Sequence, residues 1–131
     1  MTTLALVAVV GAVVASLLHV VFFVLESLRF RDPATWRRFG VASQEHADAI
    51  APMAFNQGFY NLFLALGTLV GAAVLVAGDR DVGWALMLFG CSTMVGAALV
   101  LAATSRDLLR AAVLQGAPPL LCIGAALSNF T

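Results

Sequence analysis

Residues 49–78 read AIAPMAFNQGFYNLFLALGTLVGAAVLVAG and contain no Asp, Glu, Lys or Arg. A helix of about 20 apolar residues is long enough to cross the hydrocarbon core of a membrane. The run nevertheless holds a polar hexad, Asn56-Gln57-Gly58-Phe59-Tyr60-Asn61. A carboxamide in apolar surroundings costs about 2–7 kcal/mol unless its hydrogen-bonding groups are paired. The run therefore predicts a membrane-spanning helix whose polar hexad needs partners on neighbouring helices.

Three further segments also lack all four charged residue types, at residues 1–25, 82–105 and 111–131. The whole chain is 62% hydrophobic and 11% charged, whereas soluble domains carry about 25% charged residues. We therefore expect an all-α integral membrane protein with four spans in a single domain over residues 1–131. The spans are expected near residues 3–28, 48–77, 83–104 and 107–129.

The connections between these spans define the expected topology. Those at residues 78–82 and 105–107 are short, which requires antiparallel neighbours and favours an antiparallel four-helix bundle. The first connection is long and contains Asp32-Pro33, a helix N-cap residue followed by proline at the first helical position. An aromatic residue and two arginines follow, in Trp36-Arg37-Arg38. We expect a short interfacial helix between spans one and two. Its role is that of an ordinary membrane anchor or, as the alternative, of a segment that binds a lipid or another ligand.

Arginine is unevenly distributed between the two ends of the predicted bundle. The first and third connections hold six of the seven basic residues, and the second connection holds only Arg80. The positive-inside rule then places both termini on the outer side of a cytoplasmic membrane. The formal net charge is zero, so we expect no nucleic-acid partner.

Polar side chains from all four spans are expected at similar depth. With a helical rise of ~1.5 Å per residue, they lie ~12–19 Å from the arginine-rich ends of their spans. They are His19, Gln57, Asn61, Thr93 and Gln115. Glu26 lies seven residues after His19, so both side chains share one face of the first span. The pattern predicts an intramembrane polar pocket.

His19 and Glu26 are the expected catalytic residues, because ionisable groups in spans are rare and usually mark a pathway or a reactive site. An apolar setting disfavours the charged form of a carboxyl, so Glu26 is the candidate general acid and His19 the base. The expected substrate-binding residues are the polar ones of the other spans: Asn56, Gln57, Tyr60, Asn61, Thr93 and Gln115. The spacing of Cys91 and Cys122 does not suit a metal, so we expect two packing residues, no metal and no cofactor.

Three sequence marks resemble a known family. The first is His19-x6-Glu26 with aromatic residues between, and the third is Gln115-Gly116 followed by Pro118. The second is the hexad continued by Leu62-Phe63-Leu64-Ala65, with Gly67 beyond it. Over nearly its full length the chain resembles the small bacterial integral membrane proteins grouped as domain of unknown function 1304. The resemblance implies four spans and names no activity.

Three functions fit the pattern. The first is an enzyme that uses acid–base chemistry on a lipophilic, isoprenoid-like substrate, such as epoxide opening, isomerisation or cyclisation. The second is a proton-coupled transporter for small molecules, with Glu26 as the exchanging carboxyl. The third is an accessory membrane protein without chemistry, whose polar layer fastens the helices. The expected partners are membrane lipids and a lipophilic small molecule, and the sequence indicates no oligomeric state.

Overall fold

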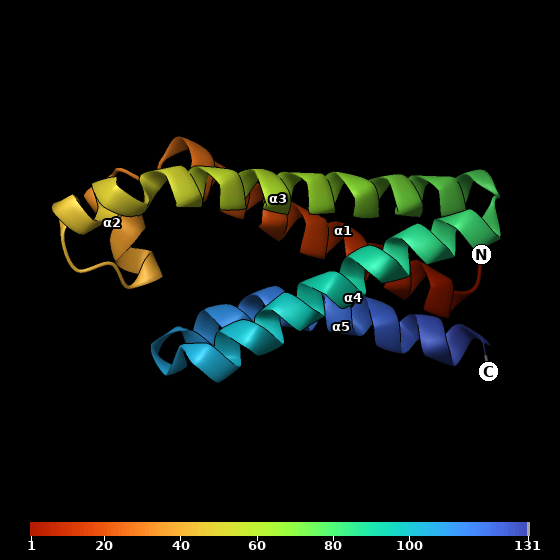
Figure 1. Ribbon diagram of the computed structural model, residues 1–131. Helices are drawn as coiled ribbons and strands as arrows, with labels where there is room; N and C mark the ends of the chain where they lie inside the picture. The colour runs from red at the N-terminus through yellow and green to blue at the C-terminus, as the bar shows by residue number, and fades with distance from the viewer. Residues whose placement is uncertain (131) are drawn as a thin grey trace.

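The computed structural model describes residues 1–130 and consists of helices joined by short turns (Figure 1). Four helical stretches are long and apolar enough to cross a membrane. They are α1 (Thr3–Phe23) with the π-helical turn η1 (Val24–Leu28), α3 (Gln44–Ala77), α4 (Arg80–Thr104), and the 3-10 turn η3 (Arg106–Leu108) with α5 (Leu109–Phe130). The predicted all-α fold with four membrane-capable helices is confirmed.

The second and third spans begin earlier than predicted, at Gln44 and Arg80. Ser43 caps α3 by accepting a hydrogen bond from the His46 backbone N–H, and Asp79 caps α4 in the same way through Val82. The prediction placed the starts near residues 48 and 83, where the uncharged runs begin. Helices extend to their capping residues instead, so charged residues occupy their first turns.

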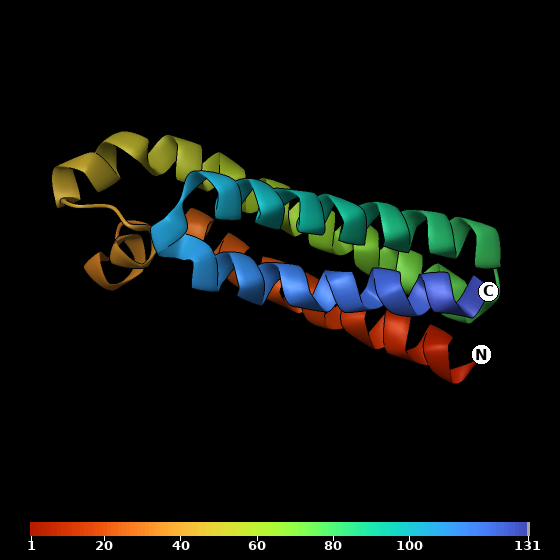
Figure 2. The ribbon, with the colours of Figure 1, turned by 90° about the horizontal axis from the view of Figure 1, so that it is seen from below.

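The helices pack in the cyclic order α1–α3–α4–α5, with α5 returning against α1. Both termini lie at the same end of the bundle (Figures 1 and 2). At that end α3 and α4 approach closely, because Gly71 faces the Met87 backbone and Gly83 faces Leu75. At the opposite end the α4–α5 pair diverges from α3 (Figure 1).

Small residues form the buried seam of the bundle. Ala5, Ala8, Ala12 and Ala15 are buried on one face of α1, at the spacing of successive helical turns. Small side chains let helix backbones approach closely in membranes. The two free cysteines, Cys91 and Cys122, are buried in the same hydrophobic cluster, in line with their predicted packing role.

Large apolar side chains cover the outside of the helices. On α1 they include Val10, Val14, Leu17 and Val21, each about half exposed or more. A soluble protein rarely exposes apolar surface of this extent. The outer surface is compatible with an integral membrane protein.

The predicted short helix between the first two spans is α2 (Pro33–Trp36), which continues into the 3-10 turn η2 (Arg37–Phe39). Asp32 occupies the N-cap position, but its carboxylate pairs with Arg29 at 3.2 Å and does not cap the helix. Trp36 is only 5% exposed, and its indole N–H donates to Gln44 Oε1 at 3.1 Å. This contact holds α2 and η2 against the first turn of α3.

Candidate functional site

A cavity of about 340 Å³ lies between the four spans, toward the α2 end where the helix pairs diverge. Its volume falls in the range of small-molecule pockets, about 300–1,000 Å³. The residues that line it come from every span and from η2: His19, Phe22, Leu25, Glu26, Arg38, Phe39, Gln57, Asn61, Ala97, Leu101, Leu108, Ala111 and Gln115. The cavity is thus mainly apolar, with ionisable and carboxamide side chains at selected points of its wall.

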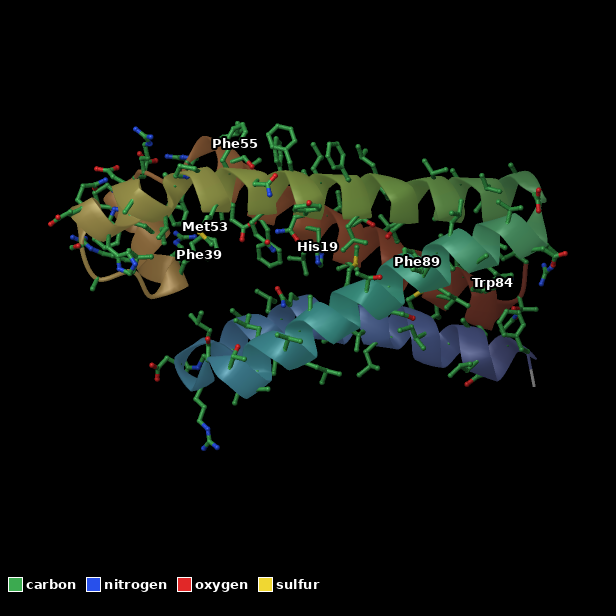
Figure 3. All side chains as sticks on the ribbon, viewed as in Figure 1. His19, Phe39, Met53, Phe55, Trp84 and Phe89 are labelled. Carbon is green, nitrogen blue, oxygen red and sulfur yellow. The ribbon has the colours of Figure 1, made fainter. Side chains whose placement is uncertain are left out.

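His19 is the most deeply buried ionisable side chain of this wall, with 2% of its surface exposed. It lies inside the bundle, between α3 and the α4–α5 pair (Figure 3). Its Nδ1 is 2.9 Å from the Ala15 carbonyl oxygen, so Nδ1 carries the proton and donates this bond. In the neutral imidazole Nε2 then holds the free lone pair. The ring is fixed further by an edge contact with Phe22 at 5.5 Å.

Glu26 lies in the π-helical turn that ends the first span. Its Oε2 accepts a hydrogen bond of 2.6 Å from the Asn61 side-chain amide on α3. A single π turn within an α-helix inserts one extra residue, and such turns are frequent at functional sites. The bond fixes the carboxyl and joins the first span to the second.

Gly58 allows this approach of η1 to α3. A Cβ atom at Gly58 would lie 3.0 Å from the Ser27 backbone nitrogen and 3.1 Å from Glu26 Cβ, and it would overlap the Ser27 hydroxyl. That hydroxyl donates to the Phe55 carbonyl at 2.8 Å. The glycine of the hexad is therefore a packing requirement of the site.

The structure brings five of the eight predicted site residues to one cavity: His19, Glu26, Gln57, Asn61 and Gln115. Within residues 1–130, the side chains of Gln57 and Gln115 have no hydrogen-bond partner. Gln115 is partly buried, and Gln57 is exposed at the cavity edge. Two carboxamides therefore remain available to a bound molecule.

Three predicted residues, Asn56, Tyr60 and Thr93, lie outside the cavity lining. Asn56 and Tyr60 are one turn apart and therefore share a helix face, and both are exposed, Tyr60 by 64%. The polar residues of the hexad lie on two faces of α3, and only the face that carries Gln57 and Asn61 lines the cavity. Thr93 donates to the Phe89 carbonyl of its own helix at 2.9 Å, a local bond common for threonine in helices.

Arg38 and Phe39 line the cavity but were not among the predicted site residues. Both belong to η2, which follows the interfacial helix. The sequence predicted this segment as a membrane anchor. Its place at the cavity depends on the first connection folding back toward the bundle, and no local pattern signals that fold. The only sequence feature that marks Arg38 as a candidate site residue is its position next to an aromatic residue.

The comparison with protein families matches residues 13–127 to the family model described as "Protein of unknown function (DUF1304)". The matched range contains every residue that lines the cavity, from His19 to Gln115. No curated protein and no solved structure matches the chain. Because the family model covers most of the chain, the protein belongs to the DUF1304 family.

Proposed function

We propose that the protein is a membrane enzyme that carries out acid–base chemistry on a lipophilic, isoprenoid-like substrate. The observation that carries the proposal is the joint presence of a fixed imidazole, a fixed carboxyl and free carboxamides in one largely apolar cavity. A mostly apolar pocket with a few converging polar groups is the usual form of a small-molecule site.

His19 is the base in this proposal. Its Nδ1 proton is engaged by the Ala15 carbonyl, which leaves Nε2 as the atom that accepts a proton from the substrate. The buried position keeps the ring away from bulk water. A proton taken from an allylic or hydroxyl position of the substrate would pass to Nε2.

Glu26 is the acid, and Asn61 orients it through the 2.6 Å bond. Glu26 also lines a second hollow, of about 360 Å³, beside the loop residues Arg29, Arg31 and Asp32. Glu26 thus borders both the cavity and a second hollow at the α2 end, whose lining includes charged loop residues. Its place supports a cycle in which Glu26 gives a proton to the substrate and His19 takes one from it. The cycle closes when His19 releases its proton and Glu26 regains one from the side of the second hollow.

The cavity wall supports a hydrocarbon substrate with one polar group. Phe22, Leu25 and Leu101 provide apolar contacts, while Gln57 and Gln115 offer unpaired carboxamides. Such carboxamides stabilise charge that develops during proton transfer. A double-bond isomerisation needs only one proton given and one taken, so it requires no co-reactant. Epoxide opening and cyclisation also begin with proton donation.

The alternative of an accessory protein, in which the polar side chains only hold the helices together, requires each of them to bind another helix. Asn61 does so through Glu26, but Gln57 and Gln115 have no such bond within residues 1–130. The transporter alternative requires the cavity to open on both sides of the membrane. The close contacts of Gly71 and Gly83 between α3 and α4 lie toward the opposite end. Both observations support a one-sided ligand site.

The arginine distribution supports the orientation that we propose. Six of the seven basic residues lie at the α2 end of the bundle, five of them between the spanning α-helices and Arg110 in the first turn of α5. The positive-inside rule then assigns this end to the cytoplasm of a bacterial inner membrane and both termini to the outside. The second hollow beside Glu26 would thus receive protons from the cytoplasm.

The test uses purified protein in lipid nanodiscs, incubated with a panel of isoprenoid alcohols and epoxides, with products followed by gas chromatography and mass spectrometry. We expect conversion of at least one compound, lowered about 10²–10⁴-fold in Glu26→Gln and in His19→Ala. The chain offers matched controls in its only other Glu and His, Glu45 and His46, which are exposed on the first turn of α3. Glu45→Gln and His46→Ala should convert at the wild-type rate. Unchanged turnover in both Glu26→Gln and His19→Ala would remove the site assignment.

A further inference from the structure

Arg38 lies in the turn that lines the α2 end of the cavity. It belongs to η2, and both Arg38 and the following Phe39 line the cavity wall. The turn is held from two sides, by the buried Trp36 bonded to Gln44 and by a ring contact of 5.8 Å between Phe30 and Phe39. The guanidinium of Arg38 is thus carried by an anchored segment.

The charge of Arg38 is not matched within the described chain. Arg29 pairs with Asp32 at 3.2 Å, and the Arg37 guanidinium lies 5.0 Å above the Trp36 ring. Within residues 1–130, Arg38 has neither an ion pair nor a ring contact, even though Glu26 lines the same cavity. Glu26 is bonded to Asn61 instead. The Arg38 side chain is exposed, and it lines the cavity without an anion of the described chain as its partner.

We propose that the cavity takes an amphiphile with an anionic head group, a phosphate or a carboxylate, which Arg38 binds at the α2 end. The planar guanidinium offers paired N–H donors that match such groups. The hydrocarbon tail then lies along Phe22, Leu25 and Leu101, past Glu26 and His19. This inference rests on the proposed function, because it names the substrate class of the same site.

The test compares two ligands with the same tail, geranyl phosphate and geraniol. Binding to purified protein is measured by calorimetry in nanodiscs of phosphatidylcholine, which carries no net charge. We expect geranyl phosphate to bind about 10-fold more tightly or better, the usual gain from a hydrogen bond to a charged group. Arg38→Gln should abolish this preference and leave geraniol binding within about threefold of wild type, because the apolar wall is unchanged.

Two variants control the result. Arg38→Lys keeps the charge without the paired donors, so part of the preference should remain. Arg110, exposed in the first turn of α5, lies outside the cavity lining, so Arg110→Gln should keep the full preference. Equal affinity of wild type for the two ligands, or an equal loss in Arg38→Gln and Arg110→Gln, would overturn the proposal. Thermal midpoints of all variants establish that each is folded.

A last arm distinguishes a free amphiphile from a membrane phospholipid as the source of the anion. The binding of geranyl phosphate is measured again in nanodiscs that contain phosphatidylglycerol. If this lipid weakens the binding in wild type but not in Arg38→Gln, the result supports the anion site and assigns it to lipid head groups. If phosphatidylglycerol leaves the binding of geranyl phosphate unchanged, the result supports an anion site for a free amphiphile. Binding of geraniol without phosphate preference would overturn this inference alone, whereas binding of neither ligand would also count against the proposed function.

Discussion

Substituting alanine for Gly58 tests the contact between η1 (Val24–Leu28) and α3 on which the site depends. The added Cβ would lie 3.0 Å from the Ser27 nitrogen and 3.1 Å from Glu26 Cβ, both tighter than ordinary van der Waals contact. Overpacking of this kind costs about 1–3 kcal/mol. Replacing a mid-helix glycine by alanine also gains about 0.5–1 kcal/mol of helix stability.

Gly67→Ala is the matched control, because it lies on the same helix and its added Cβ would meet no atom within 4 Å. The helix gain is common to both variants and cancels in their comparison. Gly58→Ala should therefore be about 1–3 kcal/mol less stable than Gly67→Ala. The assay is reversible unfolding in mixed micelles with increasing sodium dodecyl sulfate, followed by circular dichroism. Equal stability of the two variants would refute the close approach of η1 to α3.

Two further predictions use the same unfolding assay. Asn61→Leu removes the donor to Glu26 and should cost about 1–3 kcal/mol. Asn56 is exposed and has no hydrogen bond to the described chain, so Asn56→Leu removes an unpaired carboxamide and should cause no loss of stability. Similar losses in both variants would contradict the placement of the hexad. Met87 is fully buried, so Met87→Ala should lower the free energy of unfolding by about 2–5 kcal/mol. Met53 is 74% exposed, so Met53→Ala should leave it nearly unchanged. A nearly neutral Met87→Ala would contradict the described core.

The four helices and their order follow from the hydrophobic runs, because a membrane-spanning helix needs little more than length and apolar composition. Helix ends depend on local capping, and so Gln44 and Arg80 were assigned to loops although they begin α3 and α4. The π-helical turn at Val24–Leu28 has no sequence signal that we can identify. It arises where η1 packs against Gly58, a contact that depends on the tertiary fold.

The candidate site was predictable in part. The depth estimate grouped Gln57 with Asn61, and both line the cavity. It could not decide which polar face of α3 points inward, because Asn56 and Tyr60 form an equally regular pair. The depth estimate for Thr93 did not show which way its side chain points. Its hydroxyl forms a hydrogen bond to the Phe89 carbonyl within its own helix. Arg38 was missed because its position depends on how the first connection folds back.

Deuterium incorporation is the measurement that tests acid–base chemistry at His19 and Glu26 most directly. Wild-type protein in nanodiscs is incubated in D₂O with the isoprenoid fraction of a bacterial membrane extract, and the extract is analysed by mass spectrometry. The proposal predicts that at least one isoprenoid gains deuterium at carbon with wild type and with Glu45→Gln, but not with Glu26→Gln or His19→Ala. Labelling by Glu26→Gln at the wild-type rate would contradict the role of Glu26 as the acid. No labelled isoprenoid with wild type would contradict isomerisation and cyclisation as the reaction.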